Sequence, residues 1–301
     1  MTLAAAGLTA CGGGGGGSGA SVVGGVGVTV TPFTSWSAVT PGSTVAAAAD
    51  SQEGTYTWNA FTNRVTATTV SAPSPSSTFT QRFGSNGLAQ AVRFQTASGT
   101  DISFTRGPDT FFTLTINSNF WGVESGDETR YALMADPILI GWEYQSFGVW
   151  TTGAGSGSGT YGSASAGSRT PSGSIPASGF AVYLGYAGGR HVASDGSHFF
   201  TLSSMQTSVN FATRQLSFST NFTEQTQNLY TSTPNNSLNM NGTLSYSAGS
   251  NQFSGPVSTA GGLTGTAQGR FYGPAAQEIG GTFSTTGPGV QSYGGAFGGA
   301  R

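Results

Sequence analysis

The chain has 301 residues but little charge and almost no cysteine. Asp, Glu, Lys and Arg make up 7% of it, against about 25% in an average globular protein, and the net charge is −2. A nearly neutral chain has no basic surface that could hold nucleic acid, which excludes that class of partner. The single cysteine excludes a disulfide bond within the chain.

Long apolar runs are also missing. No stretch of 18 apolar residues occurs, so no transmembrane helix is expected in the mature chain. Aromatic residues make up 12%, including 20 Phe, which is enough to build hydrophobic cores. No acid, base and nucleophile converge in the pattern, so we expect a protein that is not an enzyme.

The N-terminal motif is LTAC, formed by Leu8, Thr9, Ala10 and Cys11. This is the pattern of a bacterial lipobox, in which the cysteine becomes the first mature residue and carries lipid. A glycine-rich run follows it, as in a flexible tether. The ten residues before Cys11 contain no Lys or Arg and are too short for a full signal peptide. We therefore interpret residues 1–27 as a truncated lipoprotein signal, a lipid-anchor cysteine and a tether.

Residues 28–137 are predicted to form a small β-rich domain. The pattern indicates hairpins and short strands bounded by turn residues. The expected strands are 55–59 paired with 64–70, 91–96 paired with 102–105, and 111–116, with a short helical piece at 46–49 and a loop at 71–77.

Residues 138–301 alternate apolar and polar side chains over longer segments, which is typical of β-strands. Residues 153–167 are expected to be a Gly/Ser loop. About eight strands are predicted, the number at which side chains can fill a barrel interior. They are 138–150, 180–186, 199–211, 216–222, 238–246, 251–268 with an irregularity at Gly261 and Gly262, and two near the C-terminus.

The C-terminal stretch has the clearest pattern. Leu263, Ala267 and Phe271 fall on one face of an extended chain, together with two glycines. The pair Gly273-Pro274 then breaks the strand, and the next four residues suit one helical turn. The pattern therefore predicts two strands joined by a single turn, with glycines that let the backbones approach closely.

The sequence FYGPAAQEIGGTF at residues 271–283, followed by a terminal GGAF, closely resembles the end of the C-terminal barrel in transferrin-binding protein B and its relatives. The residues that carry the resemblance are Gly273, Pro274, Glu278, Gly280, Gly281 and Phe283. That family consists of bacterial surface lipoproteins. The resemblance implies an all-β protein, with a handle domain at 28–137 and an eight-stranded antiparallel barrel at 138–301, lipid-anchored in the outer membrane at the cell surface.

The same resemblance implies a function in binding. The protein would bind an iron source or haem, or its host carrier protein, for uptake through an outer-membrane transporter. Two alternatives remain open: a host-factor-binding or adhesion lipoprotein similar to factor H binding protein, and a barrel that spans the outer membrane. Ligand contacts are expected from loops of both domains rather than from the barrel interior, since large side chains fill an eight-stranded barrel.

Haem or iron is implied only as a bound ligand, and no other cofactor is implied. Some relatives bind haem through histidines of the handle domain, but residues 28–135 contain no histidine. Tyr131 and Met134 remain as candidate axial ligands.

Three further side chains have candidate roles. His191 and His198 flank a turn that contains Asp195, so together they could hold a metal ion. The more common interpretation is two exposed loop histidines. Glu278 is expected to accept hydrogen bonds from backbone N–H groups near Gly280 and Gly281.

Overall fold

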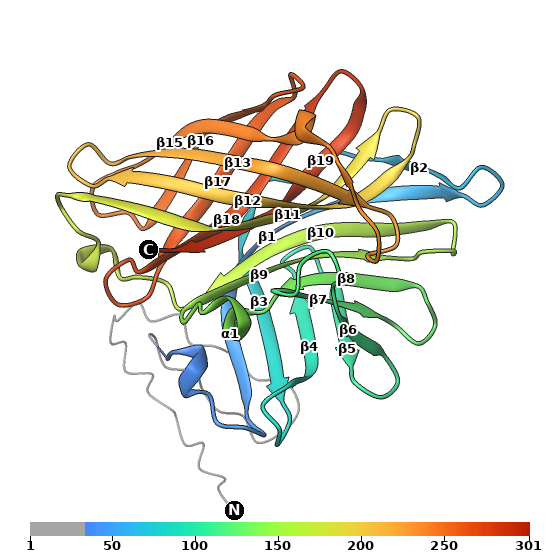
Figure 1. Ribbon diagram of the computed structural model, residues 1–301, viewed down its shortest axis with the longest axis horizontal. Helices are drawn as coiled ribbons and strands as arrows, with labels where there is room; N and C mark the ends of the chain where they lie inside the picture. Colours follow the sequence, from blue (N-terminus) through green and yellow to red (C-terminus); the bar gives the residue numbers. More distant parts are fainter. Residues whose placement is uncertain (1–33) are drawn as a thin grey trace, which may run out of the picture.

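The computed structural model describes residues 34–301, which form two antiparallel β-sheets (Figure 1). The N-terminal sheet, drawn in blue to green, lies below the C-terminal sheet, drawn in yellow to red. Within residues 34–301, no helix is long and apolar enough to cross a membrane. The lipobox residues Leu8, Thr9, Ala10 and Cys11 lie outside the described residues.

The first sheet has ten strands and is open and curled. Its strand order is β5-β4-β3-β1-β10-β9-β8-β7-β6, with β2 paired to β1. The strands are β1 (Thr44–Asn59), β2 (Arg64–Ala67), β3 (Ser74–Phe83), β4 (Ala89–Gln95), β5 (Asp101–Thr105), β6 (Thr110–Thr113), β7 (Phe120–Glu124), β8 (Arg130–Ala135), β9 (Gln145–Thr152) and β10 (Ser158–Gly167). A short helix, α1 (Pro137–Ile140), connects β8 to β9, and a 3-10 turn, η1 (Trp36–Ala38), precedes β1.

The second sheet is an eight-stranded barrel, closed because β12 pairs with both β11 and β13. The two-residue β14 (Thr233–Pro234) adds to β13 outside the ring. The 3-10 turns are η2 (Ser172–Ser174) and η3 (Asn236–Leu238). The barrel strands are β11 (Phe180–Ala193), β12 (His198–Asn210), β13 (Gln215–Thr226), β15 (Met240–Tyr246), β16 (Gln252–Thr259), β17 (Thr264–Tyr272), β18 (Glu278–Gly287) and β19 (Val290–Ala300).

Large apolar side chains fill the barrel interior. Leu244, Phe253 and Phe271 are fully buried there, and the Phe253 and Phe271 rings meet edge to face at 5.3 Å. The expected face of the C-terminal stretch is therefore confirmed, as is the all-β fold with an eight-stranded antiparallel barrel. The first sheet has its own core, in which Phe94 lies 5.0 Å from both Phe79 and Trp150.

The predicted boundary at residue 138 does not coincide with the division between the sheets. The expected first barrel strand, 138–150, became α1 and β9, and the expected loop, 153–167, contains β10; both strands belong to the first sheet. The small residues of β10 suggested a loop, but they fit a central strand under large neighbours. A Cβ atom at Gly162 would lie 2.5 Å from the Trp150 ring.

Other local predictions were also wrong. Residues 46–49 lie within β1, because pairing with β3 on one side overrides the helix propensity of alanine. Residues 251–268 are two strands, since Gly262 adopts φ +87° in a tight turn between them. Pro75 lies in β3 where the pairing with β1 is irregular, so the missing N–H is tolerated. The predicted helical turn after Gly273 is a simple turn.

Candidate functional site

The two sheets meet along a junction in which β9 and β10 pack against β18 and β19 of the barrel. The residues of the C-terminal motif lie on or beside this junction. Its polar contacts, its cavity and the outer barrel surface next to it are the candidate functional regions.

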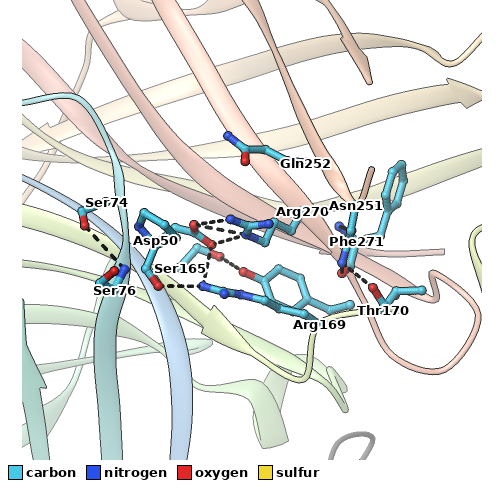
Figure 2. A network of polar contacts seen from close by, with 12 residues as sticks. Asp50, Ser74, Ser76, Ser165, Arg169, Thr170, Asn251, Gln252, Arg270 and Phe271 are labelled. Carbon is cyan, nitrogen blue, oxygen red and sulfur yellow. Dashed lines mark hydrogen bonds and ion pairs between the residues drawn. The ribbon is translucent and has the colours of Figure 1, made fainter. Parts of the chain in front are cut away.

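One end of the junction contains a buried ion cluster. Asp50 of β1 is 4% exposed. Its carboxylate accepts a hydrogen bond from Arg270 Nε of β17 at 2.8 Å and one from Arg169 Nη2 at 3.2 Å. Figure 2 shows both guanidinium groups beside the Asp50 carboxylate, with that of Arg270 above that of Arg169. The cluster ties the first sheet to the barrel and to the segment that connects them.

Glu278 forms a second polar contact across the junction. Its carboxylate accepts hydrogen bonds from the backbone N–H groups of Glu143 at 2.5 Å and Tyr144 at 2.9 Å. The residue thus binds backbone N–H groups, but those before β9 rather than those near Gly280 and Gly281. Burial raises the pKa of Glu278 to about 7, although these hydrogen bonds act in the opposite direction.

Two glycines let the sheets approach closely at the junction. A Cβ atom at Gly280 would lie 2.6 Å from Ser165 Oγ, and one at Gly298 would lie 2.4 Å from the Gln145 amide. A side chain at either position would force the Ser165 or the Gln145 side chain to move. Gly280 of the motif and Gly298 at the end of β19 therefore fit the docking of the first sheet.

The other motif residues act within the barrel end. Gly273 has φ +84° and lies against the Tyr144 ring, so it serves both the turn and the junction. Pro274 is exposed in that turn. Gly281 lies against the Gln268 carbonyl of β17, and Phe283 is buried in the barrel core.

The expectation of exposed loop histidines was wrong. His191 is 7% exposed on β11, with its ring 6.1 Å from Tyr293. His198 opens β12, and because it pairs with Val192 rather than with His191, the two rings lie on opposite faces of the sheet. Burial lowers the pKa of His191, and burial together with Arg190 lowers the pKa of His198 to about 4. Asp195 instead contacts Ser197 and Arg64.

No candidate metal or haem ligands come together in the described part of the chain. No group of three His, Cys, Asp or Glu residues is close enough to hold a metal within residues 34–301. Tyr131 and Met134 are three positions apart on β8, so they face opposite sides of the sheet. Met134 is buried in the first core, whereas Tyr131 lies at the junction.

Two features were not found from the sequence. The first is a cavity of about 230 Å³ at the other end of the junction, next to the buried guanidinium of Arg190. The second is a row of exposed apolar side chains on the outer barrel face. Phe180 and Leu184 of β11 are 82% and 61% exposed, and Phe222 of β13 is 76% exposed. The strand alternation contained the signal for this row, since Phe180, Val182 and Leu184 face away from the buried Ala181 and Tyr183.

Of these apolar residues, Leu184 and Phe222 border a groove of about 460 Å³. Leu184, Tyr186 and Phe222 lie on its barrel side, and Ile140 and Trp142 lie on the side next to α1. Phe222 adopts φ +55°, which is unfavourable for a bulky residue. At this irregularity both Asn221 and Phe222 face solvent, so the distortion places the aromatic ring on the surface.

A closed eight-stranded barrel joined to an open curled sheet is the class of architecture observed. Residues 175–301 match the model of a protein family described as the C-lobe and N-lobe beta barrels of Tf-binding protein B. The matched segment begins just before β11 and includes the whole barrel. The resemblance found in the C-terminal sequence is thereby confirmed, and the barrel is of the transferrin-binding protein B type.

Solved structures of transferrin-binding protein B are among the similar folds. The intact protein titled Ap-TbpB, with N and C lobes, has 17% identity and a TM-score of 0.47, covering 92% of this chain and 47% of that one. Isotype 1 from serogroup B Neisseria meningitidis has 17% identity and a TM-score of 0.46, covering 84% and 43%. A double mutant from Haemophilus parasuis has 16% identity and a TM-score of 0.45, covering 84% and 44%.

This chain thus spans about half the length of these relatives. A comparison with curated protein sequences found no match.

Proposed function

We propose that this protein is a cell-surface lipoprotein that binds a host or environmental iron-carrying protein for uptake through an outer-membrane transporter. The observation that carries the proposal is the barrel, whose 127-residue segment from 175 to 301 matches the barrels of transferrin-binding protein B. Relatives with that barrel are titled transferrin-binding proteins. The partner is therefore expected to be a protein that carries iron.

The exposed apolar row and its groove form the proposed contact surface for that partner. Single exposed apolar residues are common, but a contiguous group is characteristic of interaction sites. Phe180, Val182 and Leu184 follow one another along the outer face of β11, and Phe222 borders the same groove as Leu184. Aromatic side chains such as those of Phe180 and Phe222 are enriched at protein interfaces.

The polarity of the barrel argues against the alternative of a membrane-spanning barrel. On β15, Asn241, Thr243 and Ser245 face out and are exposed, whereas Leu244 faces the interior and is fully buried. A barrel in the outer membrane needs the opposite arrangement, with an apolar band facing lipid. A host-factor-binding lipoprotein remains the second candidate, and it differs from the first in having a partner that carries no iron.

The anchoring proposal rests on the LTAC motif and the glycine run after it. Lipid at Cys11 would tether both sheets to a membrane, and two or more acyl chains are needed for a stable anchor. Cells that express the gene with its natural upstream start would be labelled with a palmitate analogue and then treated with protease while intact. Cys11→Ser is expected to lose the label and to release the protein. Label retained in that variant would refute the anchor.

The binding proposal is tested with iron-loaded transferrin immobilised on a sensor surface. The double variant Leu184→Ser, Phe222→Ser removes the centre of the apolar surface, and we expect it to bind at least tenfold more weakly than wild type. Thr243→Ser, a polar change on the exposed face of β15 outside the groove, is the control and should bind like wild type.

A pull-down from serum with immobilised wild-type protein extends the test to other carriers. Captured proteins would be identified and their iron content measured. Specific capture of an iron-free protein would favour the second candidate. Equal capture by wild type and the double variant would exclude the apolar surface as the contact site.

A further inference from the structure

Arg190 is a buried cation without an ionic partner among residues 34–301. It lies on β11, opposite Phe200 of β12 and Gly294 of β19, and is 8% exposed. Its guanidinium carbon lies 5.0 Å from the centre of the Phe200 ring. Among residues 34–301, no carboxylate forms an ion pair with it. A buried arginine is normally paired, so this one requires an explanation.

The two tyrosine hydroxyls near Arg190 are hydrogen-bonded to other groups. The Tyr56 hydroxyl donates to the Thr152 carbonyl at 2.5 Å, and the Tyr161 hydroxyl lies 2.7 Å from Ser292 Oγ. Burial lowers the pKa of Arg190 to about 10, so the side chain remains charged near neutral pH. Its charge is therefore not neutralised by a protein anion in contact with it.

Arg190 lines the cavity at this end of the junction. Its side chain shares the outer barrel face with Phe200 and His198, because Arg190 pairs with Phe200, and Val192 pairs with His198. The first sheet covers this face with Tyr56 and Trp58 of β1. The cavity is thus bounded by both sheets and by the loop at residues 227–230.

The cavity walls combine aromatic rings with polar side chains and contain few ionisable groups. The rings belong to Tyr56, Trp58, Phe112, Tyr131, Phe200 and Tyr230, and the uncharged polar side chains to Asn63, Thr151, Gln227 and Asn228. The carboxylate that lines the cavity belongs to Glu124, which lies on β7 opposite Tyr131 of β8. His198 is its other ionisable side chain of note, and its lowered pKa keeps it neutral above about pH 5.

The volume fits a small organic molecule. The cavity measures about 230 Å³, whereas an apolar cavity of about 150 Å³ is enough to bind benzene. One ring with a short polar substituent can therefore be accommodated. The unpaired guanidinium offers the strongest recognition element, because it presents a planar pair of donors that matches a carboxylate.

We propose that this cavity binds a small carboxylic acid with one ring, whose carboxylate pairs with Arg190 and whose ring packs against the aromatic walls. Glu124 would accept a hydrogen bond from a hydroxyl or amino group at the far side of such a ring. The ligand would be held between the two sheets, so its binding would depend on the junction as a whole. This site is separate from the exposed apolar surface and does not depend on the carrier partner.

The proposal is tested by titration calorimetry of the whole chain with benzoate, phenylacetate and 4-hydroxybenzoate. The corresponding neutral amides have nearly the same shape and serve as controls. We expect at least one acid to bind at least tenfold more tightly than its amide. This comparison uses the wild-type protein only, so it is independent of how any variant folds. Equal affinity of acid and amide, or no binding of any acid, would overturn the proposal.

Two variants locate the anion site. Arg190→Met removes the charge but keeps a long apolar side chain, and it should weaken the bound acid at least tenfold while leaving amide affinity unchanged. Arg190→Lys keeps the charge but loses the bidentate donor geometry, so an intermediate affinity is expected. Undiminished acid binding by a folded Arg190→Met variant would show that the carboxylate binds elsewhere.

Discussion

Both ends of the junction contain largely buried arginine, but among residues 34–301 only one end supplies a carboxylate to pair with it. At one end, Arg169 and Arg270 share the buried carboxylate of Asp50. At the other end, Arg190 is buried beside a cavity and has no ionic partner among residues 34–301. Both ends lie between the barrel and the first sheet, so burial alone does not distinguish them.

The difference separates a structural role from a binding role. A buried charge must be balanced, because removing it from water costs several kcal/mol even after the protein relaxes. At the Asp50 end the protein supplies the balance, and the result is a connection between the sheets. At the Arg190 end, the negative charge comes from the proposed carboxylate ligand in the cavity.

The first prediction concerns the loss of the balancing anion. Asp50→Asn keeps the shape of the side chain but leaves two largely buried guanidinium groups without a carboxylate. We expect the free energy of unfolding to fall by about 3–5 kcal/mol, as measured by urea denaturation. The control is Asp101→Asn, which removes the partner of Arg93 in a more exposed pair and should cost about 0–1 kcal/mol. Similar losses in both variants would mean that the buried cluster has no special role.

Phe271→Ala compares the interior and exterior of the barrel. The Phe271 ring contacts Phe211, Tyr246 and Phe253 in the core, so its loss should lower the free energy of unfolding by about 3–5 kcal/mol. Phe180→Ala on the outer face should change it by less than about 0.5 kcal/mol. A cost below about 1 kcal/mol for Phe271→Ala would show that this face does not form the core.

Glu278 makes the junction sensitive to pH. Its carboxyl group keeps its proton up to about pH 7 in the folded protein, but loses it near its ordinary pKa of 4.5 when unfolded. The folded state therefore binds more protons between these values, and stability falls as pH rises through this window. We expect a loss of up to about 3 kcal/mol between pH 4.5 and 7.5, beyond that of Glu278→Gln at each pH. Parallel pH profiles for the two proteins would rule out this titration.

Gly298→Ala tests the close approach of the two sheets, and the expected loss of stability is smaller. The added methyl group would meet the Gln145 amide, and overpacking of this kind costs about 1–3 kcal/mol. Shortening the neighbour in the double variant Gly298→Ala, Gln145→Ala should recover part of the loss. A fully additive cost in the double variant would show that the two positions do not interact.

The sequence predicted the barrel better than the first sheet, for a physical reason. Barrel strands such as β12 and β15 have one apolar and one polar face, so alternation reveals them. The strand β10 is buried from Tyr161 onward and is built mostly from Gly, Ser and Ala, which gives no alternation. The alanines of β1 likewise indicated a helix, since alanine has the highest helix propensity. They form a strand only because β1 pairs with β3 and β10.

The junction could be predicted only in part. The motif around Glu278 was recognisable, but its partners are the N–H groups of residues 143 and 144, more than 130 positions away. Nothing in the local sequence distinguishes Arg190 from Arg169 or Arg270. Their difference arises only when strands from both sheets are brought together. The role of the histidines was also misjudged, because burial of His191 depends on the ends of β12 and β19.

Arg190 and Asp50 differ in role, the first serving binding and the second stability. The most direct test is the free energy of unfolding of Arg190→Met and Asp50→Asn without added ligand. Arg190→Met is expected to be as stable as wild type or more stable, because replacing an unpaired buried charge by an apolar side chain removes a desolvation penalty. Asp50→Asn is expected to lose about 3–5 kcal/mol. A loss of that size in Arg190→Met, with Asp50→Asn near wild type, would contradict a binding role for Arg190 and a stabilising role for Asp50.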